Sequence, residues 1–582
     1  MNTGKWSSIL ATLVGILCLI CSSFSEPAPY HTFAKDATAA PPLVFYDYII
    51  VGGGTSGCAL AATLSQGGRV LLLERGGLPY DDPNIMDIKG FGATLANTSP
   101  SSPSQLFIST DGVINHRARV LGGGTALNAG FYSRASTDYV SRVGWDQRAV
   151  NESYEWVENK VVFEPEVGAW QSAVRSGLLE AGQFPYNGFT YDHVKGTKVG
   201  GTIFDGSGYR HTAADLLEYA HPPNITIYLH AIVEQILFKT EKLPRPRAHG
   251  VLFLDPRGNR HLAFLNRGSA NEIILSAGAL GSPQLLMLSG IGPTGHLRTH
   301  GIKVLLDQPM VGQGMADNPM NAIVVPSRRP VETSLIQIVG ITQFGSYVES
   351  ASGPVAFNWV NGLNQQYHKL SNEQTSWPSS VPANQSTSSS RANEAHIDDF
   401  MDASQPAGII LEKISGPYSS GHLELQNRDP NDNPRVTFNY FHDRRDLQRC
   451  VQGMELIRRV IDSRSLSRFR YPLTPVQTLI NWMLTFPVNL RPRRVSAAFS
   501  MEHFCEDTVM TIWHYHGGCQ VGKVVDRNYR VVGVDALRVI DGSTFSESPG
   551  TNPQATVMML GRYMGQRILN ERDSQCNEAV ED

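Results

Sequence analysis

Residues Tyr46–Glu74 read YDYIIVGGGTSGCALAATLSQGGRVLLLE, and this segment determines the architecture of the chain. An apolar strand, expected over Tyr46–Val51, runs directly into a glycine-rich turn. A helix is expected over Cys58–Gln66, and a second buried strand over Arg69–Leu73 is closed by an acid. Strand, glycine loop, helix, strand and acid together form the unit that binds dinucleotides in Rossmann-like folds, whereas a glycine pattern alone indicates only a tight turn.

Each glycine of the loop has a separate role in this interpretation. Gly52 makes the turn, Gly54 lets the backbone approach a pyrophosphate, and Gly57 lets the helix pack on the strand. Thr55, in the same loop, lies where the helix N-terminus faces the phosphate charge. Glu74, 22 positions after Gly52, is expected to bind ribose hydroxyls. An acid at this place argues against a 2′-phosphate on the ligand.

The bulk composition indicates a large enzyme rather than a nucleic-acid-binding protein. The chain has 582 residues, of which 41% are hydrophobic and 18% charged, with a formal net charge of −4. This length and composition suffice for a large core and more than one domain. No segment is strongly basic, which excludes nucleic acid as an expected partner.

The N-terminus has the pattern of an export signal. Lys5 precedes the apolar run Ile9–Ile20, and small residues follow. The run is too short for a comfortable membrane span, so residues 1–25 are expected to be a cleaved signal peptide, with an uncleaved anchor as the alternative. Proline-rich residues 26–43 are expected to form a flexible linker. No later apolar run is long enough for a stable membrane span, and we expect a secreted, extracellular (cell wall) protein.

The remaining cysteines and the sequons fit this location. Five cysteines follow the signal peptide, which is too few for a disulfide scaffold, and they lack zinc-type pairing. No metal site is therefore expected. Glycosylation is possible at four Asn-x-Ser/Thr sequons if the chain is exported. These sequons begin at Asn97, Asn151, Asn224 and Asn384.

A second glycine-rich loop lies within ARVLGGGTALNAGFYSRAS, Ala118–Ser136. The three glycines Gly122–Gly124, followed by Thr125 and Asn128, indicate backbone pressed against a ligand. The alternative is a flexible loop. The apolar Val120 before the glycines favours a buried loop.

The third unusual segment spans Trp513–Gln554 and contains two polar side chains with complementary chemistry. His514 can act as a base because the histidine pKa lies near neutrality. Asn552 can donate a hydrogen bond to a developing alkoxide without competing for its proton. His516 is a rival for the base, and Asn552 before a proline is also compatible with a simple turn.

These motifs resemble those of the glucose–methanol–choline oxidoreductases, a family of FAD enzymes. The resemblance rests on Ala118–Ser136, on GALGSPQLLMLSGIG at Gly278–Gly292, and on the closing histidine and asparagine segment. It covers roughly residues 44–572. Within the family, phrases such as WHYHGGC at Trp513–Cys519 are most similar to the plant HOTHEAD-like branch, which is close to the mandelonitrile lyases.

The resemblance implies an α/β fold with two discontinuous parts. A Rossmann-like FAD-binding domain is expected over 44–140, 221–318 and 505–572. An α+β substrate domain on an antiparallel sheet is expected over 141–220 and 319–504, and residues 573–582 form a tail.

The resemblance also implies roles for single residues. Val233 would pair with adenine through its backbone, Trp513 would lie beside the isoalloxazine, and Asp541 would approach the flavin. His514 occupies the histidine position of the family's H-x-x-G motif. The full set of expected cofactor contacts is Gly52, Gly54, Thr55, Gly57, Glu74, Val120, Gly124, Thr125, Asn128, Val233, Trp513, His514, Asp541, Gly542, Asn552, Pro553 and Gln554.

A disulfide follows from the same resemblance, because lyase relatives carry a similarly placed bridge. It would join Cys450 to Cys505, with two buried free thiols as the alternative. Cys519 lies near His514 in the sequence, and we expect an inert buried thiol there.

The resemblance leaves three functions to compare. The first is oxidation of an alcohol, with a lipid-like, long-chain ω-hydroxy fatty acid on the way to cuticular dicarboxylic acids as the implied substrate. The second is hydroxynitrile lyase activity with a non-redox FAD; lyase relatives carry histidine where this chain has Asn552, which favours oxidation. The third is a secreted flavoprotein without turnover.

Overall fold

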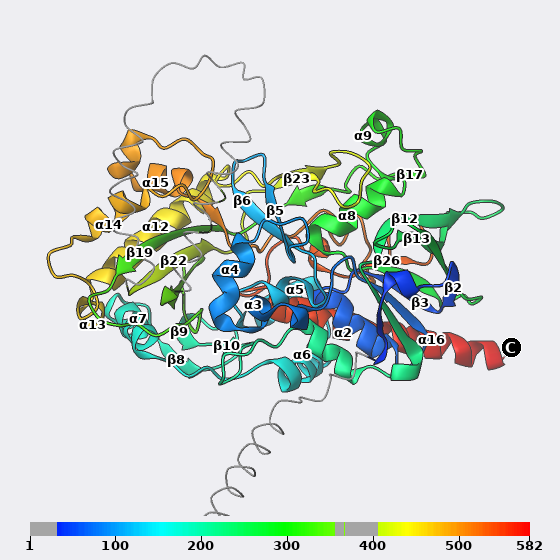
Figure 1. Ribbon diagram of the computed structural model, residues 1–582, viewed down its shortest axis with the longest axis horizontal. Helices are drawn as coiled ribbons and strands as arrows, with labels where there is room; N and C mark the ends of the chain where they lie inside the picture. The colour runs from blue at the N-terminus through cyan, green and yellow to red at the C-terminus, as the bar shows by residue number, and fades with distance from the viewer. Residues whose placement is uncertain (1–31, 355–361, 363–365, 367–405, 582) are drawn as a thin grey trace, which may run out of the picture.

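A computed structural model describes residues 32–354, 362, 366 and 406–581 of the chain (Figure 1). The expected signal peptide over 1–25 and the sequon at Asn384 lie outside the described residues. Two large sheets dominate the described part. In Figure 1 the parallel sheet that carries β3 and β26 lies on the right, and the antiparallel sheet that carries β19 and β22 lies on the left.

The first large sheet has six strands, all parallel, in the order β1-β11-β4-β3-β15-β26. Its central strands are buried on both faces, which explains why they read as continuous apolar runs. The strands are β1 (Ala34–Asp36), β3 (Tyr48–Val51), β4 (Val70–Leu73), β11 (Ile225–Leu229), β15 (Glu272–Leu275) and β26 (Leu537–Val539).

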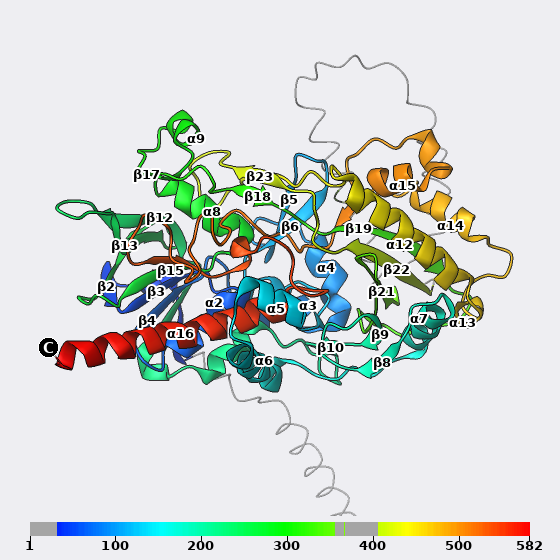
Figure 2. The same ribbon diagram turned by 180° about the vertical axis from the view of Figure 1, so that it is seen from behind.

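Helix α2 (Thr55–Leu64) connects β3 to β4, as the glycine-loop pattern predicts. The C-terminal helix α16 (Gln554–Glu581) packs against α2 (Figure 2). Glycines permit this close approach, since a Cβ on Gly561 would lie 2.3 Å from the carbonyl oxygen of Ser56.

A four-stranded sheet of β2 (Leu43–Tyr46), β12 (Ile232–Lys239), β13 (Arg247–Leu254) and β14 (Arg260–Leu265) flanks the parallel sheet. The single strand expected over Tyr46–Val51 is therefore two strands in different sheets. The break is at Asp47, whose side chain accepts a hydrogen bond from the Arg69 backbone amide at 2.9 Å. The linker expected over 26–43 also differs from the structure, because β1 extends the parallel sheet at its edge.

The second large sheet has seven strands in the order β25-β19-β22-β21-β20-β9-β8, antiparallel except for the β8–β9 pair. Helices α7 (Ala169–Glu180), α12 (Arg444–Asp462) and α14 (Val476–Met483) pack against it, and Figure 2 shows α12 lying along it. The strands are β8 (Tyr186–Phe189), β9 (Gly196–Val199), β19 (Pro319–Pro326), β20 (Ile338–Ile341), β21 (Ser346–Ser352), β22 (Ala407–Ile414) and β25 (Met510–Thr511).

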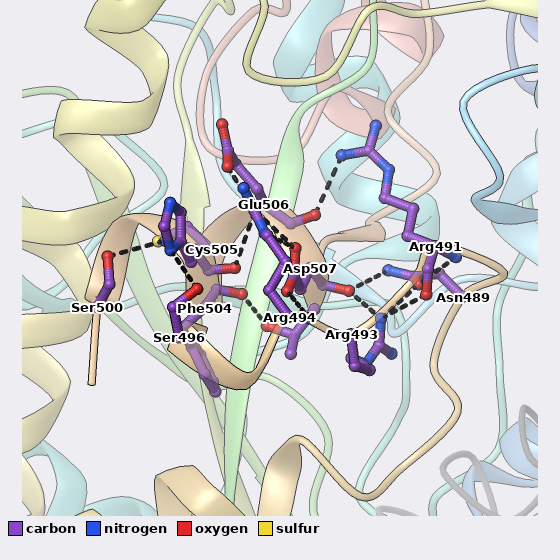
Figure 3. A network of polar contacts seen from close by, with 12 residues as sticks. Asn489, Arg491, Arg493, Arg494, Ser496, Ser500, Phe504, Cys505, Glu506 and Asp507 are labelled. Carbon is purple, nitrogen blue, oxygen red and sulfur yellow. Dashed lines mark hydrogen bonds and ion pairs between the residues drawn. The ribbon is translucent and has the colours of Figure 1, made fainter. Parts of the chain in front are cut away.

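The expected disulfide between Cys450 and Cys505 is present, with the two Cα atoms 6.3 Å apart. It joins α12 to α15 (Met501–Asp507). A polar network holds the other side of α15 (Figure 3), where the Asp507 carboxylate accepts from the Arg494 backbone amide at 2.7 Å and from its guanidinium at 2.6 and 2.9 Å. Both attachments fix the segment that leads into β25.

Packing divides the chain slightly differently from the expected domain boundaries. Helix α6 (Gln147–Val161) and the 3-10 helix η6 (Ala213–Tyr219) pack against α16 and α2, on the parallel-sheet side. Strand β25, expected in the FAD-binding part, belongs to the seven-stranded sheet.

The other helices are α3 (Pro83–Met86), α4 (Phe91–Ala96), α5 (Thr137–Val143), α8 (Gly278–Leu288), α9 (Thr294–Thr299) and α13 (Arg464–Ser467). The other strands are β5 (Ser104–Ile108), β6 (Ile114–Ala118), β7 (Phe131–Tyr132), β10 (Gly201–Thr202), β16 (Ile291–Gly292), β17 (Leu306–Asp307), β18 (Gln313–Met315), β23 (Gly421–Glu424) and β24 (Arg435–Thr437).

Among the described residues, no helix is both long enough and apolar enough to span a bilayer.

Candidate active site

A cavity of about 290 Å³ receives wall residues from all three segments that the sequence singles out. Its walls come from the β3–α2 turn, the second glycine loop, the N-terminus of α8 and the segment around His514. Fifteen of the 17 expected cofactor contacts line this cavity. The two that do not are Gly57 and Thr125.

The glycines of the β3–α2 turn are of two kinds: at some a Cβ would clash with protein atoms, and at one it would project into the cavity. Gly52 has a φ of +103°, and a Cβ on it would lie 2.5 Å from the Ser276 carbonyl oxygen. A Cβ on Gly57 would lie 2.0 Å from the Gly52 oxygen, so this glycine serves helix packing rather than the cavity wall. At Gly54, by contrast, a Cβ would meet its nearest protein atom at 3.7 Å. The open side of Gly54 therefore faces the cavity.

Four glycines share this open geometry and make the cavity suitable for a large flat ligand with phosphates. A Cβ on Gly124 would meet only Thr55 Oγ1, at 4.0 Å, and at Gly278 and Gly542 it would meet no atom of the described residues within 4 Å. Together with Gly54, these positions present bare backbone to the cavity. The arrangement fits a dinucleotide such as FAD, whose phosphates would lie at the N-terminus of α2.

Glu74 is fixed at the end of β4. Its carboxylate accepts hydrogen bonds from the backbone amides of Gly53 and Gly76, both at 2.8 Å. Burial raises the pKa of this carboxyl. Because each carboxylate oxygen has a further lone pair, Glu74 can still bind ribose hydroxyls from its place in the cavity wall.

Val233, near the start of β12, also lines the cavity. The register with β13 shifts between Val233 and Gln235, which marks a β-bulge. A bulge leaves backbone groups outside the ladder. This geometry is compatible with the backbone pairing to adenine that the family resemblance implies.

The second glycine loop is held by hydrogen bonds to neighbouring segments, which argues against the alternative of a flexible loop. Thr125 Oγ1 donates to the Gly122 oxygen at 2.6 Å and accepts from the Ala213 amide at 2.9 Å, which places it behind the wall. The buried Arg210 guanidinium donates to the carbonyl oxygens of Thr125 and Asn128 at 3.1 and 2.7 Å. Thr125 therefore stiffens the loop and does not line the cavity.

Two hydrogen bonds join this loop to the C-terminal segment. Asn128 Nδ2 donates to Gln554 Oε1 at 2.9 Å, and Gln554 Nε2 donates to the Phe131 oxygen at 2.6 Å. The Asp541 carboxylate ties the segment to α8, because it accepts from the Gly278 amide at 2.9 Å. All three motifs are thus connected around one cavity.

His514 follows β25 and is held through its backbone. Its amide donates to Asp317 Oδ1 at 2.9 Å, and Asp317 Oδ2 accepts from the Thr511 hydroxyl at 2.6 Å. The imidazole Nδ1 is buried without a hydrogen-bond partner among the described residues. Burial, and then the positive charge of Lys413, hold the pKa of His514 well below its usual range. The ring is therefore neutral near pH 7 and can accept a proton.

His516 also lines the cavity but is more constrained than His514. Its Nδ1 donates to the His514 carbonyl oxygen at 2.9 Å, and the side chain is only 2% exposed. Burial lowers the pKa of His516 to about 4. The structure thus gives His516 a structural hydrogen bond, whereas the ring of His514 is the more accessible of the two.

Asn552 lies in the cavity wall just before α16. Its Oδ1 accepts a hydrogen bond from Lys413 Nζ at 2.9 Å, and Lys413 also donates to Glu349 Oε1 at 2.8 Å. The turn-forming alternative for Asn552 therefore does not account for its side chain, which is bound by a buried cation.

Sequence reasoning missed Asp317 and Lys413. Asp317 lies in VGQGMADNP, Val311–Pro319, where only its polarity before Asn-Pro distinguishes it. Lys413 lies in AGIILEKI, Ala407–Ile414, where adjacent charges inside an otherwise apolar strand are a usable signal.

Cys519, in agreement with expectation, is a buried free thiol, and burial raises its pKa.

The family described as GMC oxidoreductase matches residues 46–320 and 417–561. The chain is 52% identical to Protein HOTHEAD of Arabidopsis thaliana (90% of this chain, 88% of the relative) and 46% identical to an (R)-mandelonitrile lyase-like protein of the same plant (97% and 99%). It is also 39% identical to the sinalpyl alcohol oxidase Nec3 of Nesocodon mauritianus (93% and 91%). A formate oxidase variant of Aspergillus oryzae shares the fold with a TM-score of 0.71 at 19% identity, over 92% of this chain and all of that one. Its three motifs surround one cavity, and the chain belongs to the GMC oxidoreductases and is an FAD-dependent oxidoreductase that acts on alcohols.

Proposed function

We propose that this enzyme oxidises the terminal CH–OH group of a long-chain ω-hydroxy fatty acid outside the cell, with His514 as the base and Asn552 as the hydrogen-bond donor. The observation that carries the proposal is that both side chains line one cavity and both lie near the ammonium of Lys413. FAD, when bound, supplies the two-electron acceptor for the hydride that leaves the alcohol carbon.

His514 supplies the proton acceptor. Its ring is neutral near pH 7 because burial and Lys413 depress its pKa, and its Nδ1 is not engaged by any described residue. The Asp317 carboxylate holds the backbone of His514, so the ring keeps a defined position. A neutral, positioned imidazole has a lone pair with which to accept the hydroxyl proton of an alcohol. Its lowered pKa makes it a weaker base than a free histidine, so a donor that stabilises the developing alkoxide is needed beside it.

Asn552 supplies the donor for the alcohol oxygen. Because its carbonyl oxygen is bound by Lys413, its Nδ2 group points away from that cation. An amide donor can stabilise the negative charge that develops on the oxygen as the proton leaves. The pair therefore provides both groups that alcohol oxidation requires.

The substrate class rests on the family branch and on the character of the wall. Apolar side chains gather in the cavity, including Leu95, Leu285, Ile336 and Ile512. Such a wall favours an apolar alcohol over a sugar. A relative named as an alcohol oxidase supports alcohol oxidation as the reaction.

A lyase function is the second candidate because a 46% identical relative is named (R)-mandelonitrile lyase-like. The same base could remove the hydroxyl proton of a cyanohydrin without any transfer of electrons. The asparagine at position 552 argues against this reaction, since the resemblance implies histidine there in the lyases.

The secreted location predicts glycans on two of the three described sequons. Asn97 and Asn151 are exposed, whereas Asn224 Nδ2 already donates to the Ser65 carbonyl oxygen at 2.9 Å. Enzymatic deglycosylation of plant-expressed protein should therefore remove mass from peptides that contain Asn97 and Asn151. A secreted protein without sugar at either position would contradict this part of the proposal.

The deciding measurement is the visible absorbance of the bound flavin after anaerobic mixing with a 16-carbon ω-hydroxy fatty acid, and separately with mandelonitrile. Bleaching by the hydroxy acid supports the proposal. The matched unsubstituted fatty acid, which lacks the hydroxyl, should leave the flavin oxidised. An unbleached flavin together with release of benzaldehyde from mandelonitrile would replace the oxidase assignment with the lyase.

A further inference from the structure

We propose that Lys413 is a positioning residue of the active site: its buried ammonium, held by Glu349, orients the Asn552 amide so that Nδ2 faces the substrate oxygen. The inference rests on the donor role of Asn552 proposed above, and it adds two residues from the seven-stranded sheet to that role.

The chemistry of the contact determines the direction of the amide. A lysine ammonium has three donors and no acceptor, so only the carbonyl oxygen of an asparagine can face it. Nζ of Lys413 lies 2.9 Å from Asn552 Oδ1 and 2.8 Å from Glu349 Oε1. With the oxygen committed to Lys413, the NH₂ group must lie on the other side of the amide.

Strand register explains how the sheet presents this pair. Glu349 on β21 lies opposite Leu411 on β22, and Lys413 is two residues further along β22, so both side chains leave the same face. The intervening Glu412 points to the other face, where a Cβ on Gly453 of α12 would lie 2.7 Å from its carboxylate. The face that carries Lys413 is thus the one turned toward Asn552.

Fold stability alone does not account for a charged pair at this place. Both side chains are 0% exposed, and Glu349 Oε2 has no hydrogen-bond partner among the described residues. Burying two charges carries a large desolvation cost, and apolar residues of similar volume often replace such a pair without loss. A role in orienting Asn552 gives the pair a function.

A neighbouring lysine provides the contrast. Lys198 on β9 is equally buried on the same sheet, but its ammonium donates to Ser133 Oγ at 2.9 Å and to the carbonyl oxygens of Thr190 and Asp192 at 3.1 and 2.7 Å. It does not contact Asn552 in the described structure. Lys198 is therefore a matched control for the loss of a buried lysine.

The first test is a double-mutant cycle on the holoenzyme, with kcat and KM for the ω-hydroxy fatty acid as readouts. Without the ammonium the amide can turn and present Oδ1 to the alcohol oxygen, so Lys413→Met should lower kcat roughly 10- to 100-fold while KM changes little. On an Asn552→Ala background, Lys413→Met should cause no further loss when kcat is compared at a pH where His514 is neutral in every variant, because loss of the lysine charge also raises the pKa of His514. Equal losses on both backgrounds, or no loss in the single variant, would overturn the proposal.

Two further variants keep the test sound. Lys413→Met leaves the buried Glu349 carboxylate unpaired, which could destabilise the fold. The double variant Lys413→Met/Glu349→Gln removes both charges and so avoids an unpaired buried carboxylate. This double variant should show the same loss of kcat as Lys413→Met. Lys198→Met, by contrast, should change kcat by the same factor in the wild-type protein and in the Asn552→Ala variant. A coupling of Lys198 to Asn552 as large as that of Lys413 would contradict the specific contact.

A second measurement separates this inference from the proposed function. High-resolution crystal structures of the wild-type and Lys413→Met holoenzymes report the hydrogen-bond partners of Asn552 without any turnover. We expect the amide to change its partners in the variant, and an unchanged Asn552 would overturn the positioning role. If the wild-type flavin is not reduced by any alcohol, the proposed function fails while this structural comparison still decides the role of Lys413.

Discussion

Substitution of Gly54 by alanine is expected to weaken FAD binding strongly while leaving the protein fold intact. An ideal Cβ at Gly54 lies 3.7 Å from the Ser276 oxygen and 4.0 Å from the Gly123 Cα, which is ordinary van der Waals contact. The free energy of unfolding of the FAD-free protein should therefore change by no more than about 0.5 kcal/mol.

The effect on the cofactor follows from the distance that a methyl group requires. Backbone amides bind phosphate oxygens at about 2.9 Å, whereas a methyl carbon needs about 3.5–4 Å. A methyl on Gly54 would hold the pyrophosphate away from the loop and weaken one or two charge-assisted hydrogen bonds, each worth about 1.5–3 kcal/mol. The Kd for FAD should rise roughly 100-fold or more.

Two other glycines make this prediction specific. Gly57→Ala places a Cβ 2.0 Å from the Gly52 oxygen and should destabilise the fold itself, by roughly 1–3 kcal/mol or more. Gly206→Ala, at an exposed position with no described atom within 4 Å of the added Cβ, should change neither quantity. FAD titration of the FAD-free protein by fluorescence, together with thermal unfolding, measures both. A yellow Gly54→Ala protein with wild-type affinity would refute the pyrophosphate assignment.

Three further predictions concern the catalytic segment and its supports. In steady-state kinetics, His514→Ala should retain FAD and lower turnover by about 10²–10⁴-fold, whereas His516→Ala should lower it much less. The acid limb of the pH profile of kcat/KM should lie below pH 6.5, because the pKa of His514 is lowered. Replacing Cys450 and Cys505 by alanine should lower the free energy of unfolding by about 4 kcal/mol for a bridge that closes 55 residues, as measured by denaturant unfolding. Burial raises the pKa of Asp317 from 3.8 to about 6. Between these two pH values the folded state keeps a proton on Asp317 that the unfolded state has lost, so the free energy of unfolding should fall as pH rises, by about 3 kcal/mol in all. Asp317→Asn should abolish that slope, and an unchanged pH profile of stability would contradict the raised pKa.

The nucleotide half of the site could be predicted from the sequence because its determinants are local. Gly52, Gly54, Gly57 and Glu74 lie within one strand–helix–strand unit, and their spacing alone predicts their places. The structure shows why each position is glycine. A Cβ on Gly52 or Gly57 would clash with protein atoms, whereas a Cβ on Gly54 would only project towards the cavity. The sequence could not show that Thr125 lies outside the cavity wall, because a loop side chain that faces the ligand and one that faces the protein give the same sequence pattern.

The catalytic half could be predicted only in part, because its supports are distant in sequence. Asn552 lies 139 residues from Lys413, and His514 lies 197 residues from Asp317. Periodicity cannot report such pairs, which depend on how two sheets meet. A charged residue in a buried strand does signal that a partner exists, as at Lys413, but it does not identify the partner.

The two catalytic candidates take their orientation from the seven-stranded sheet, although the family resemblance assigns residues 505–572 to the FAD-binding part. His514 follows β25, whose partner strand β19 begins just after Asp317, so that edge of the sheet holds the histidine backbone. Asn552 precedes α16 on the FAD-binding side, yet its amide is bound by Lys413 of β22. The proposed base and donor are thus positioned by one sheet, while the open glycines of the expected cofactor site belong largely to the other. Changes in the seven-stranded sheet should therefore alter kcat without loss of FAD, and this separation distinguishes residues that position the substrate from those that hold the cofactor.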